Sequence, residues 1–182
     1  MKVEIVNNIP KTHTGIFLLK ENAGVQTHPF FEVLSKEDQN YLAHFIKKTV
    51  IKADFSDRLV LPSGREILLL GAAEKGKFNH RKAIFAARRV IGLARREKAK
   101  RIAVHLDDFG VPGFSAAEAC EMLGVQFEMA NFEFVKYKTV PKEGLSFVER
   151  AAVVSPQTAQ ALQDALRVGK IIGEEINKAR TL

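Results

Sequence analysis

The segment His105–Gly110, which reads HLDDFG, places an imidazole and two carboxylates at the end of an apolar run. Open α/β sheets bind ligands at the carboxyl ends of their strands. There, Asp107 and Asp108 could hold a divalent metal ion or a sugar hydroxyl. No second acidic cluster with matching spacing accompanies them, so the favoured interpretation is that two solvated carboxylates open a loop.

The other groups used in catalysis are scattered along the chain. None of the five histidines has a partner at the spacing that brings two imidazoles to one helix face. Cys120, the single cysteine, falls on the apolar side of a predicted helix and is interpreted as a core thiol. The sequence contains no CxxC pair, GxSxG elbow, Walker loop or GxGxxG motif. We therefore predict no catalytic residue, metal site or cofactor in this chain.

A helical pattern over residues 79–97 carries the densest positive charge. At about 100° per residue, six cations fall on one side of this helix, and Phe85 falls among them. Arginine and aromatic side chains are both enriched at interfaces. The candidate partner or nucleic-acid face comprises Arg81, Lys82, Phe85, Arg88, Arg89, Arg95 and Arg96. The predicted core side comprises His80, Ala83, Ile84, Ala87, Val90, Ile91 and Ala94.

Three interpretations of this basic face remain open. It could follow a phosphate backbone, because neutralised phosphates release counterions. It could contact an acidic surface of the same polypeptide or of another subunit. It could also be a solvated face with Phe85 packed under a neighbouring loop. The formal net charge of +7 and the pI of about 9.6 favour an anionic partner, although a solvated basic surface would give the same values.

Length and composition indicate one globular domain. The chain has 182 residues, of which 46% are hydrophobic and 27% charged, and this is enough apolar material for a sizeable core. No apolar run approaches the roughly 20 residues of a membrane span, and the first residues do not resemble a secretory signal. With one cysteine, no internal disulfide can form. We predict a cytoplasmic protein with no membrane partner.

The elements that would position these residues alternate between strands and helices. Strands are predicted at VEIVNN, TGIFLLKE, RIAVHL and LSFVERAAVVS, with a hairpin at RLVLPSGREILLLG. Helices are predicted after Ser35, over 79–97, and from Ser115, which forms a capping box with Glu118. A last helix of about 26 residues is predicted from Ser155-Pro156. This order predicts an α/β fold with a mixed sheet and helices on both faces.

Three segments resemble the N-terminal domain of the leucine (cytosol) aminopeptidases. EILLLGAAEKGKFNHRKAIFAARRV is similar to the family's buried strand, loop and Ala-rich basic helix. FEMANFEFVKYKTVPK resembles a helix that ends in an aromatic tail, here Phe134–Lys138. GKIIGEEINKARTL resembles the helix that runs toward the catalytic domain, with an Ala-Arg-x-Leu stretch at Ala179–Leu182.

The resemblance implies a macro-domain-like fold, with a mixed sheet flanked by helices on both faces and a long C-terminal connecting helix. It divides the chain into a macro-like domain, 1–155, and a linker helix, 156–182, toward a catalytic domain expected to begin where this uncapped helix stops. The implied parent is a metal-dependent leucyl aminopeptidase that uses two divalent metal ions, zinc or manganese. None of that family's catalytic motifs matches these residues, so we expect the chain alone to be inactive.

The resemblance also implies partners. In the family, the N-terminal domain contacts its own catalytic domain and other subunits of a homo-hexamer, so we expect a role in assembly and in access to the active sites. The alternative is a nucleic-acid-binding module that acts through the basic helix, since some members of the family have a DNA-binding role. A third hypothesis, a stand-alone macro-like binder of ADP-ribose, requires a pocket near Asp107. It is disfavoured because the sequence lacks a Gly-rich loop.

Overall fold

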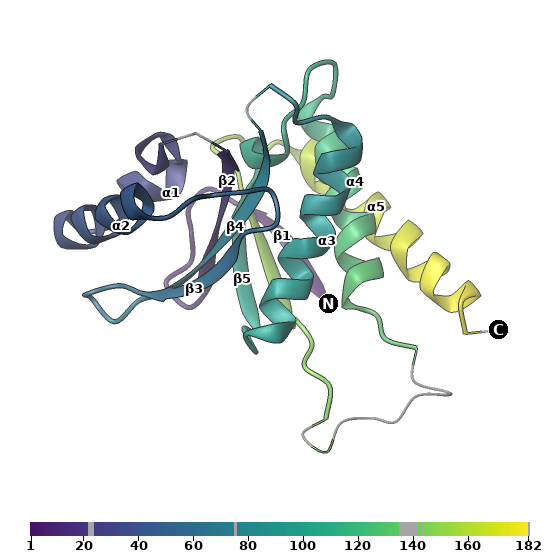
Figure 1. The fold of residues 1–182 in the computed structure, drawn as a ribbon. Helices are drawn as coiled ribbons and strands as arrows, with labels where there is room; N and C mark the ends of the chain where they lie inside the picture. The colour runs from purple at the N-terminus through teal and green to yellow at the C-terminus, as the bar shows by residue number, and fades with distance from the viewer. Residues whose placement is uncertain (22–23, 75, 135–141, 143, 182) are drawn as a thin grey trace.

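A mixed β-sheet forms the centre of the molecule (Figure 1). The computed structural model describes residues 1–21, 24–74, 76–134, 142 and 144–181. In this part of the chain, six strands form a sheet with the order β1-β6-β5-β2-β4-β3. The strands are β1 (Lys2–Val6), β2 (Thr14–Glu21), β3 (Ser56–Val60), β4 (Glu66–Glu74), β5 (Arg101–His105) and β6 (Arg150–Val154). All neighbouring pairs among them are parallel except β3 with β4.

Helices cover both faces of this sheet, as predicted. The α-helices of the described residues are α1 (Pro29–Glu32), α2 (Lys36–Lys48), α3 (His80–Arg96), α4 (Ala116–Asn131) and α5 (Gln160–Ala179). Helices α3, α4 and α5 lie on one side of the sheet, and α1 and α2 lie on the other (Figure 1). Two short 3-10 turns, Val25–Thr27 and Leu106–Phe109, follow β2 and β5. The carboxyl ends of neighbouring parallel strands therefore carry the connections that could form a site.

The predicted hairpin is confirmed by the antiparallel pairing of β3 with β4. Its second strand is buried on both faces, because Leu68 and Leu70 pack toward α3 whereas Ile67 and Leu69 pack toward α2. An interior strand covered on both faces requires the continuous apolar run that the sequence shows.

Three of the predicted helix starts are also confirmed. The side chains of Ser35, Asn79 and Ser115 each accept a hydrogen bond from a backbone N–H of the first turn. Glu118 completes the capping box, since its carboxylate accepts from the Ser115 N–H at 2.7 Å. These local contacts need no distant residue, which is why the sequence reveals them.

The predicted last strand is too long at its start. It was expected from residue 145, but β6 begins at Arg150. The Asn131 side chain binds the backbone of Val148, just before β6. Its amide nitrogen donates to Val148 O and its oxygen accepts from Val148 N, both at 2.9 Å. A side chain therefore satisfies the groups that would otherwise have joined the ladder.

The predicted start of the last helix is wrong. Helix α5 begins at Gln160, with Ala159 as a cap that has no side-chain hydrogen bond. The Ser155 hydroxyl instead accepts from the Gln157 N–H at 3.2 Å, which closes a local turn. Such side-chain turns compete with helix initiation.

Helix α5 packs directly against α4. A Cβ atom on Gly169 would lie only 2.0 Å from the carbonyl oxygen of Glu121, so the two backbones approach closely at that glycine. The buried stripe of α5 continues through Gly173 and Asn177, whereas Ile172 is 38% exposed. The division of the chain at residue 155 stays a prediction.

Candidate functional site

Helix α3 carries the predicted basic face in two rows of side chains. Seven residues span nearly two helical turns, so positions seven apart lie almost in line along a helix. One row contains Arg81, Arg88 and Arg95, and the other contains Lys82, Arg89 and Arg96. Phe85 lies between the rows and is 48% exposed, so it is not packed under a loop.

The first row binds α3 to its neighbour α4 and to the segment beyond it. The Arg88 Nε donates to Gln126 Oε1 at 2.6 Å. Arg95 donates to the carbonyl oxygens of Ser146 and Ala130 at 2.9 and 3.0 Å. It also forms a salt bridge with Glu133 at 3.1 Å. Two of the three cations in this row therefore have partners within the fold.

The second row is divided between bound and unbound cations. Arg89 donates to the carbonyl oxygens of Ala53, of Gly71 at 2.7 Å and of Phe55 at 3.2 Å. Burial lowers the pKa of its guanidinium, and the nearby Asp54 opposes that shift. A Cβ on Gly71 would lie 1.9 Å from Lys52 O, so only a glycine leaves room for the segment 52–55, whose carbonyl oxygens at Ala53 and Phe55 accept from Arg89.

Lys82 and Arg96 complete the second row. Arg96 donates to Glu97 at 2.9 Å and to the Ser56 hydroxyl at 3.3 Å, both on the exposed surface. Within the described residues, the Lys82 ammonium has no hydrogen bond or ion pair; only its backbone N–H is bonded, to Asn79 Oδ1. The seven predicted residues therefore do not form one uniform basic face, because several of them are fixed by internal contacts.

The predicted core side of α3 is only partly correct. His80 is exposed and Ile84 is partly buried, whereas Ala86 and Leu93, which were not predicted to face the core, are buried. The predicted core side was a single stripe, as expected for a helix with one packing neighbour. Because α3 packs against both the sheet and α4, its buried arc is wider than one stripe.

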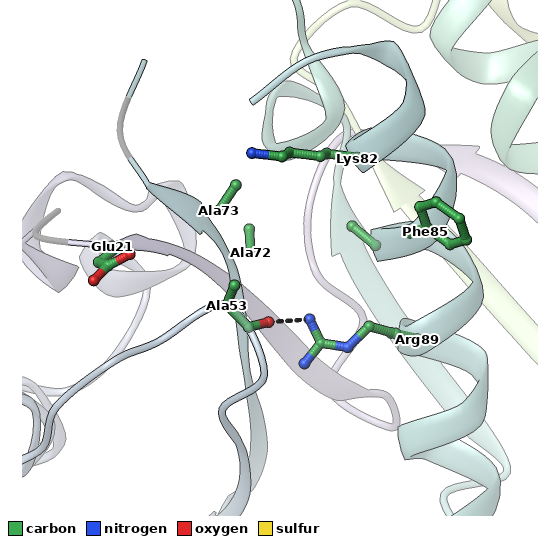
Figure 2. Close-up of a pocket in the computed structure, with 8 residues that line it drawn as sticks. Glu21, Ala53, Ala72, Ala73, Lys82, Phe85 and Arg89 are labelled. Carbon is green, nitrogen blue, oxygen red and sulfur yellow. Dashed lines mark hydrogen bonds between the residues drawn. The ribbon is translucent and has the colours of Figure 1, made fainter. Parts of the chain in front are cut away.

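A hollow of about 230 Å³ lies between α3 and the ends of β2 and β4 (Figure 2). We refer to it as the α3 hollow. It is lined by Glu21, Ala53, Ala72, Ala73, Lys82, Phe85, Ala86 and Arg89. Lys82 and Arg89 border it from α3, and Glu21 lies on the opposite side, at the end of β2 (Figure 2). The hollow therefore combines cations, a carboxylate and small apolar side chains.

The acidic segment after β5 is built differently. The Asp108 carboxylate is buried and lies 3.1 Å from His28 Nε2. The other ring nitrogen of His28 accepts from the Phe30 N–H at 3.1 Å and caps α1. Because Nδ1 is an acceptor, the proton of a neutral His28 lies on Nε2, which donates to Asp108. Asp108 thus links the segment that follows β5 to the segment that follows β2.

His105 and Asp107 complete this region, and we refer to His28, His105, Asp107 and Asp108 as the strand-end cluster. His105 Nδ1 accepts from the Asp107 N–H at 3.3 Å. Burial lowers the pKa of the His105 imidazole, while Asp108 and Asp107 oppose the shift. The Asp107 side chain is 74% exposed. The prediction of two solvated carboxylates is therefore right for Asp107 and wrong for Asp108.

A second hollow, of about 250 Å³, borders the strand-end cluster. Its lining includes Lys20, Thr27, His28, Asp107 and Asp108. The macro-like binding hypothesis required a pocket near Asp107, and this hollow provides one. His28 was not predicted to belong to this region, because it stands 80 residues from Asp108 and no local pattern connects the two.

Residues 16–141 match the family model described as "Cytosol aminopeptidase family, N-terminal domain". The chain belongs to this family. The resemblance found in the sequence is therefore confirmed. Part of its aromatic tail, residues 135–138, lies outside the described residues.

Relatives and solved structures agree with this assignment. The chain is 27% identical over 118 residues to a probable cytosol aminopeptidase of Bacillus subtilis (strain 168), covering 65% of this chain and 24% of that protein. The chain thus spans about a quarter of this curated relative. A mutant of tomato leucine aminopeptidase superposes with a TM-score of 0.70 and 15% identity, over 97% of this chain and 36% of that one.

The fold is also that of macro domains. The macro domain of ganglioside induced differentiation associated protein 2 superposes with a TM-score of 0.64 and 13% identity, covering 94% of this chain and 85% of that chain. At this identity the likeness concerns the fold alone. The prediction of a macro-domain-like mixed sheet flanked by helices is confirmed.

The two metal ions implied by the family resemblance do not fit the described residues. Over these residues, no group of three or more His, Cys, Asp or Glu side chains could hold a metal ion.

Cys120 is buried, and burial raises the pKa of its thiol to about 11, as expected for a core residue. Of the helices in the described part, none is long and apolar enough to cross a bilayer.

Proposed function

We propose that this chain is the non-catalytic N-terminal domain of a cytoplasmic, metal-dependent leucyl aminopeptidase. The match of residues 16–141 to the N-terminal domain of the family carries the proposal. Two further observations support it: the chain spans about a quarter of its Bacillus subtilis relative, and the described residues offer no cluster of metal ligands. The parent enzyme would remove N-terminal amino acids from peptides with two divalent ions, zinc or manganese, bound elsewhere.

Hydrolysis of leucine amide tests the catalytic assignment. The purified chain is assayed with added Mn²⁺ or Zn²⁺, beside a buffer blank with the same metal. We expect no turnover above the blank. Metal-dependent turnover that co-purifies with the chain would refute the non-catalytic role.

The outer side of α5 supports a role in assembly. Val168 and Ile171 are each 47% exposed, and Ile172 is 38% exposed, so three apolar side chains lie together on a helix that is otherwise packed on α4. Exposed apolar patches of this kind mark protein contacts. We assign this patch to the catalytic domain of the same polypeptide, because three quarters of the curated relative's length lies outside the match.

A binding experiment with the separately produced catalytic part tests that contact. Changing both Val168 and Ile171 to Asp should abolish co-elution of the two parts without changing the unfolding midpoint of this chain, because both residues are half exposed. Val33→Asp is the matched control, since Val33 is 52% exposed and is the C-cap of α1, which lies on the other side of the sheet. Equal co-elution of the double variant and the control would contradict the assignment.

A second candidate function is nucleic-acid binding through α3. The observation that favours it is an exposed cation–aromatic pair: the Arg81 guanidinium lies 5.6 Å from the Phe85 ring centroid, beside exposed Arg88. Binding should weaken steeply with salt, and changing Arg81 and Arg88 to Gln should reduce the salt slope. A signal that does not change with salt at low ionic strength would contradict it.

The chain is not expected to bind ADP-ribose, although the strand-end cluster borders a hollow. Calorimetric titration of the chain with ADP-ribose tests this expectation. Saturable binding that Asp107→Ala weakens would overturn it and favour the macro-like binder.

A further inference from the structure

The α3 hollow contains two opposite charges that the fold does not pair. In the described part of the chain, neither the Lys82 ammonium nor the Glu21 carboxylate takes part in a hydrogen bond or ion pair. Both side chains are half-buried. Removing a charge partly from water without a partner costs some free energy, and a ligand group of opposite charge would offset that cost.

The third charged residue of the hollow has a different role. Arg89 donates from Nη1 to the carbonyl oxygens of Ala53 and Gly71 and from Nη2 to that of Phe55, so most of its donors are used within the fold. Arg89 therefore fixes the floor of the hollow and adds positive potential, which nearby Asp54 partly offsets. The Lys82 ammonium, which has no partner in the described part of the chain, is placed to contact a ligand directly.

The remaining walls are small and apolar. Ala72 and Ala86 are buried, and Ala53 and Ala73 complete a surface of methyl groups beside the half-exposed ring of Phe85. A cavity of roughly 150 Å³ accommodates benzene, so a hollow of about 230 Å³ has room for a small ligand. The walls would favour a ligand with an aliphatic portion between its charged ends.

We propose that the α3 hollow binds a short zwitterionic peptide. Its carboxylate contacts Lys82 within the positive potential of Arg89, its ammonium contacts Glu21, and an aliphatic side chain lies against the alanines and Phe85. Glu21 lies across the hollow from Lys82 and Arg89 (Figure 2), which suits a dipeptide with charges at its two ends better than one amino acid with both charges on the same carbon.

The acidic groups argue against a polyanion in this hollow. A phosphate backbone would bring negative charge next to Glu21 and Asp54. The inference does not depend on the proposed aminopeptidase function, because it concerns binding to this chain alone and is measured without any activity.

Calorimetric titration with alanylleucine tests the proposal. The free dipeptide is compared with its N-acetylated form, which lacks the ammonium, and its C-terminal amide, which lacks the carboxylate. We expect weak, saturable binding of the free peptide and about tenfold weaker binding of each blocked form, because each loses one charge-assisted contact. Binding of all three forms with the same affinity would overturn the proposal, as would no binding of the free peptide at about 10 mM, roughly ten times a millimolar Kd.

Variants assign each end of the ligand to one residue. Lys82→Gln should weaken the free peptide about tenfold and remove the difference between free and amidated peptide. Glu21→Gln should instead remove the difference between free and acetylated peptide. Arg81→Gln is the control, since Arg81 is on the same helical turn but does not line the hollow. Loss of binding in the control equal to that in Lys82→Gln would contradict the assignment.

Discussion

The α3 hollow and the strand-end cluster are two charged regions beside the same sheet, and they treat their charges in opposite ways. In the cluster, Asp108 is paired with His28 at 3.1 Å, and both side chains are buried. In the hollow, Lys82 and Glu21 lie across an open space without a partner among the described residues. From the sequence, the acidic segment of the strand-end cluster and the basic helix of the α3 hollow were both candidates for binding. The sequence could not show which of their charges are paired within the fold.

This difference separates residues that hold the fold from residues available to a ligand. A buried polar group that already has its partners contributes to stability, and removing one partner leaves the other unsatisfied. An unpaired, half-buried charge contributes little to stability and keeps its capacity for binding. Substitutions in the cluster should therefore change stability first, and substitutions in the hollow should change binding first.

The largest effect is expected at Asp108. Asp108→Ala leaves the Nε2–H of His28 buried without an acceptor, so the free energy of unfolding should fall by about 2 to 3 kcal/mol. Urea denaturation measures it. Asp107→Ala is the matched control and should change stability by less than about 0.5 kcal/mol, because its side chain is 74% exposed. Equal losses in the two variants would remove the distinction between paired and solvated carboxylates.

A smaller effect is expected within the second row of α3. Arg89→Gln removes the donors to three carbonyl oxygens and should lower the free energy of unfolding by about 1 to 2 kcal/mol. Lys82→Gln, seven residues earlier on the same helix, should stay within about 0.5 kcal/mol of the wild type in the same urea experiment. If Lys82→Gln proved as destabilising as Arg89→Gln, Lys82 would have a structural role and would not be free for a ligand.

The smallest effect is a pH dependence that arises from His105. Burial lowers the pKa of His105 in the folded protein, so below the unfolded pKa near 6.5 the unfolded chain takes up a proton that the folded chain does not. Stability should therefore decrease as the pH falls from about 7 toward the lowered pKa. His105→Asn keeps an acceptor for the Asp107 N–H and should lose less stability over this range.

Comparing the wild type with His105→Asn isolates the contribution of His105 to the pH dependence of stability. Burial also lowers the pKa of His13, which is present in both proteins, so the variant should keep part of the pH dependence of the wild type. Urea midpoints measured at several pH values for both proteins test the prediction. Identical pH profiles would show that His105 does not titrate differently in the two states.

Local signals account for what the sequence predicted well. The Ser115–Glu118 capping box and the Ser35 cap lie within four residues of the helices they start, and the run Ile67–Leu70 indicates by itself a strand buried on both faces. Family resemblance then led to the macro-like architecture. These features depend on residues that are neighbours in the chain.

Contacts between distant residues account for what was missed. Asn131 replaces ladder bonds 17 residues away, at Val148, and so shortens the last strand. Arg89 was predicted to lie on the candidate partner or nucleic-acid face, but its guanidinium donates to carbonyl oxygens of the same chain, at residues 53, 55 and 71. A helical wheel contains no information on such partners, so the division between bound and free cations required the structure.

Backbone amide NMR shifts of the labelled chain during titration with alanylleucine test the contrast between the two regions most directly. Shifts concentrated at Ala72, Phe85, Ala86 and Arg89, with none at residues 24–30 or 105–109, are the predicted result. Shifts confined to the strand-end cluster, with the amides of the α3 hollow unchanged, would contradict the account.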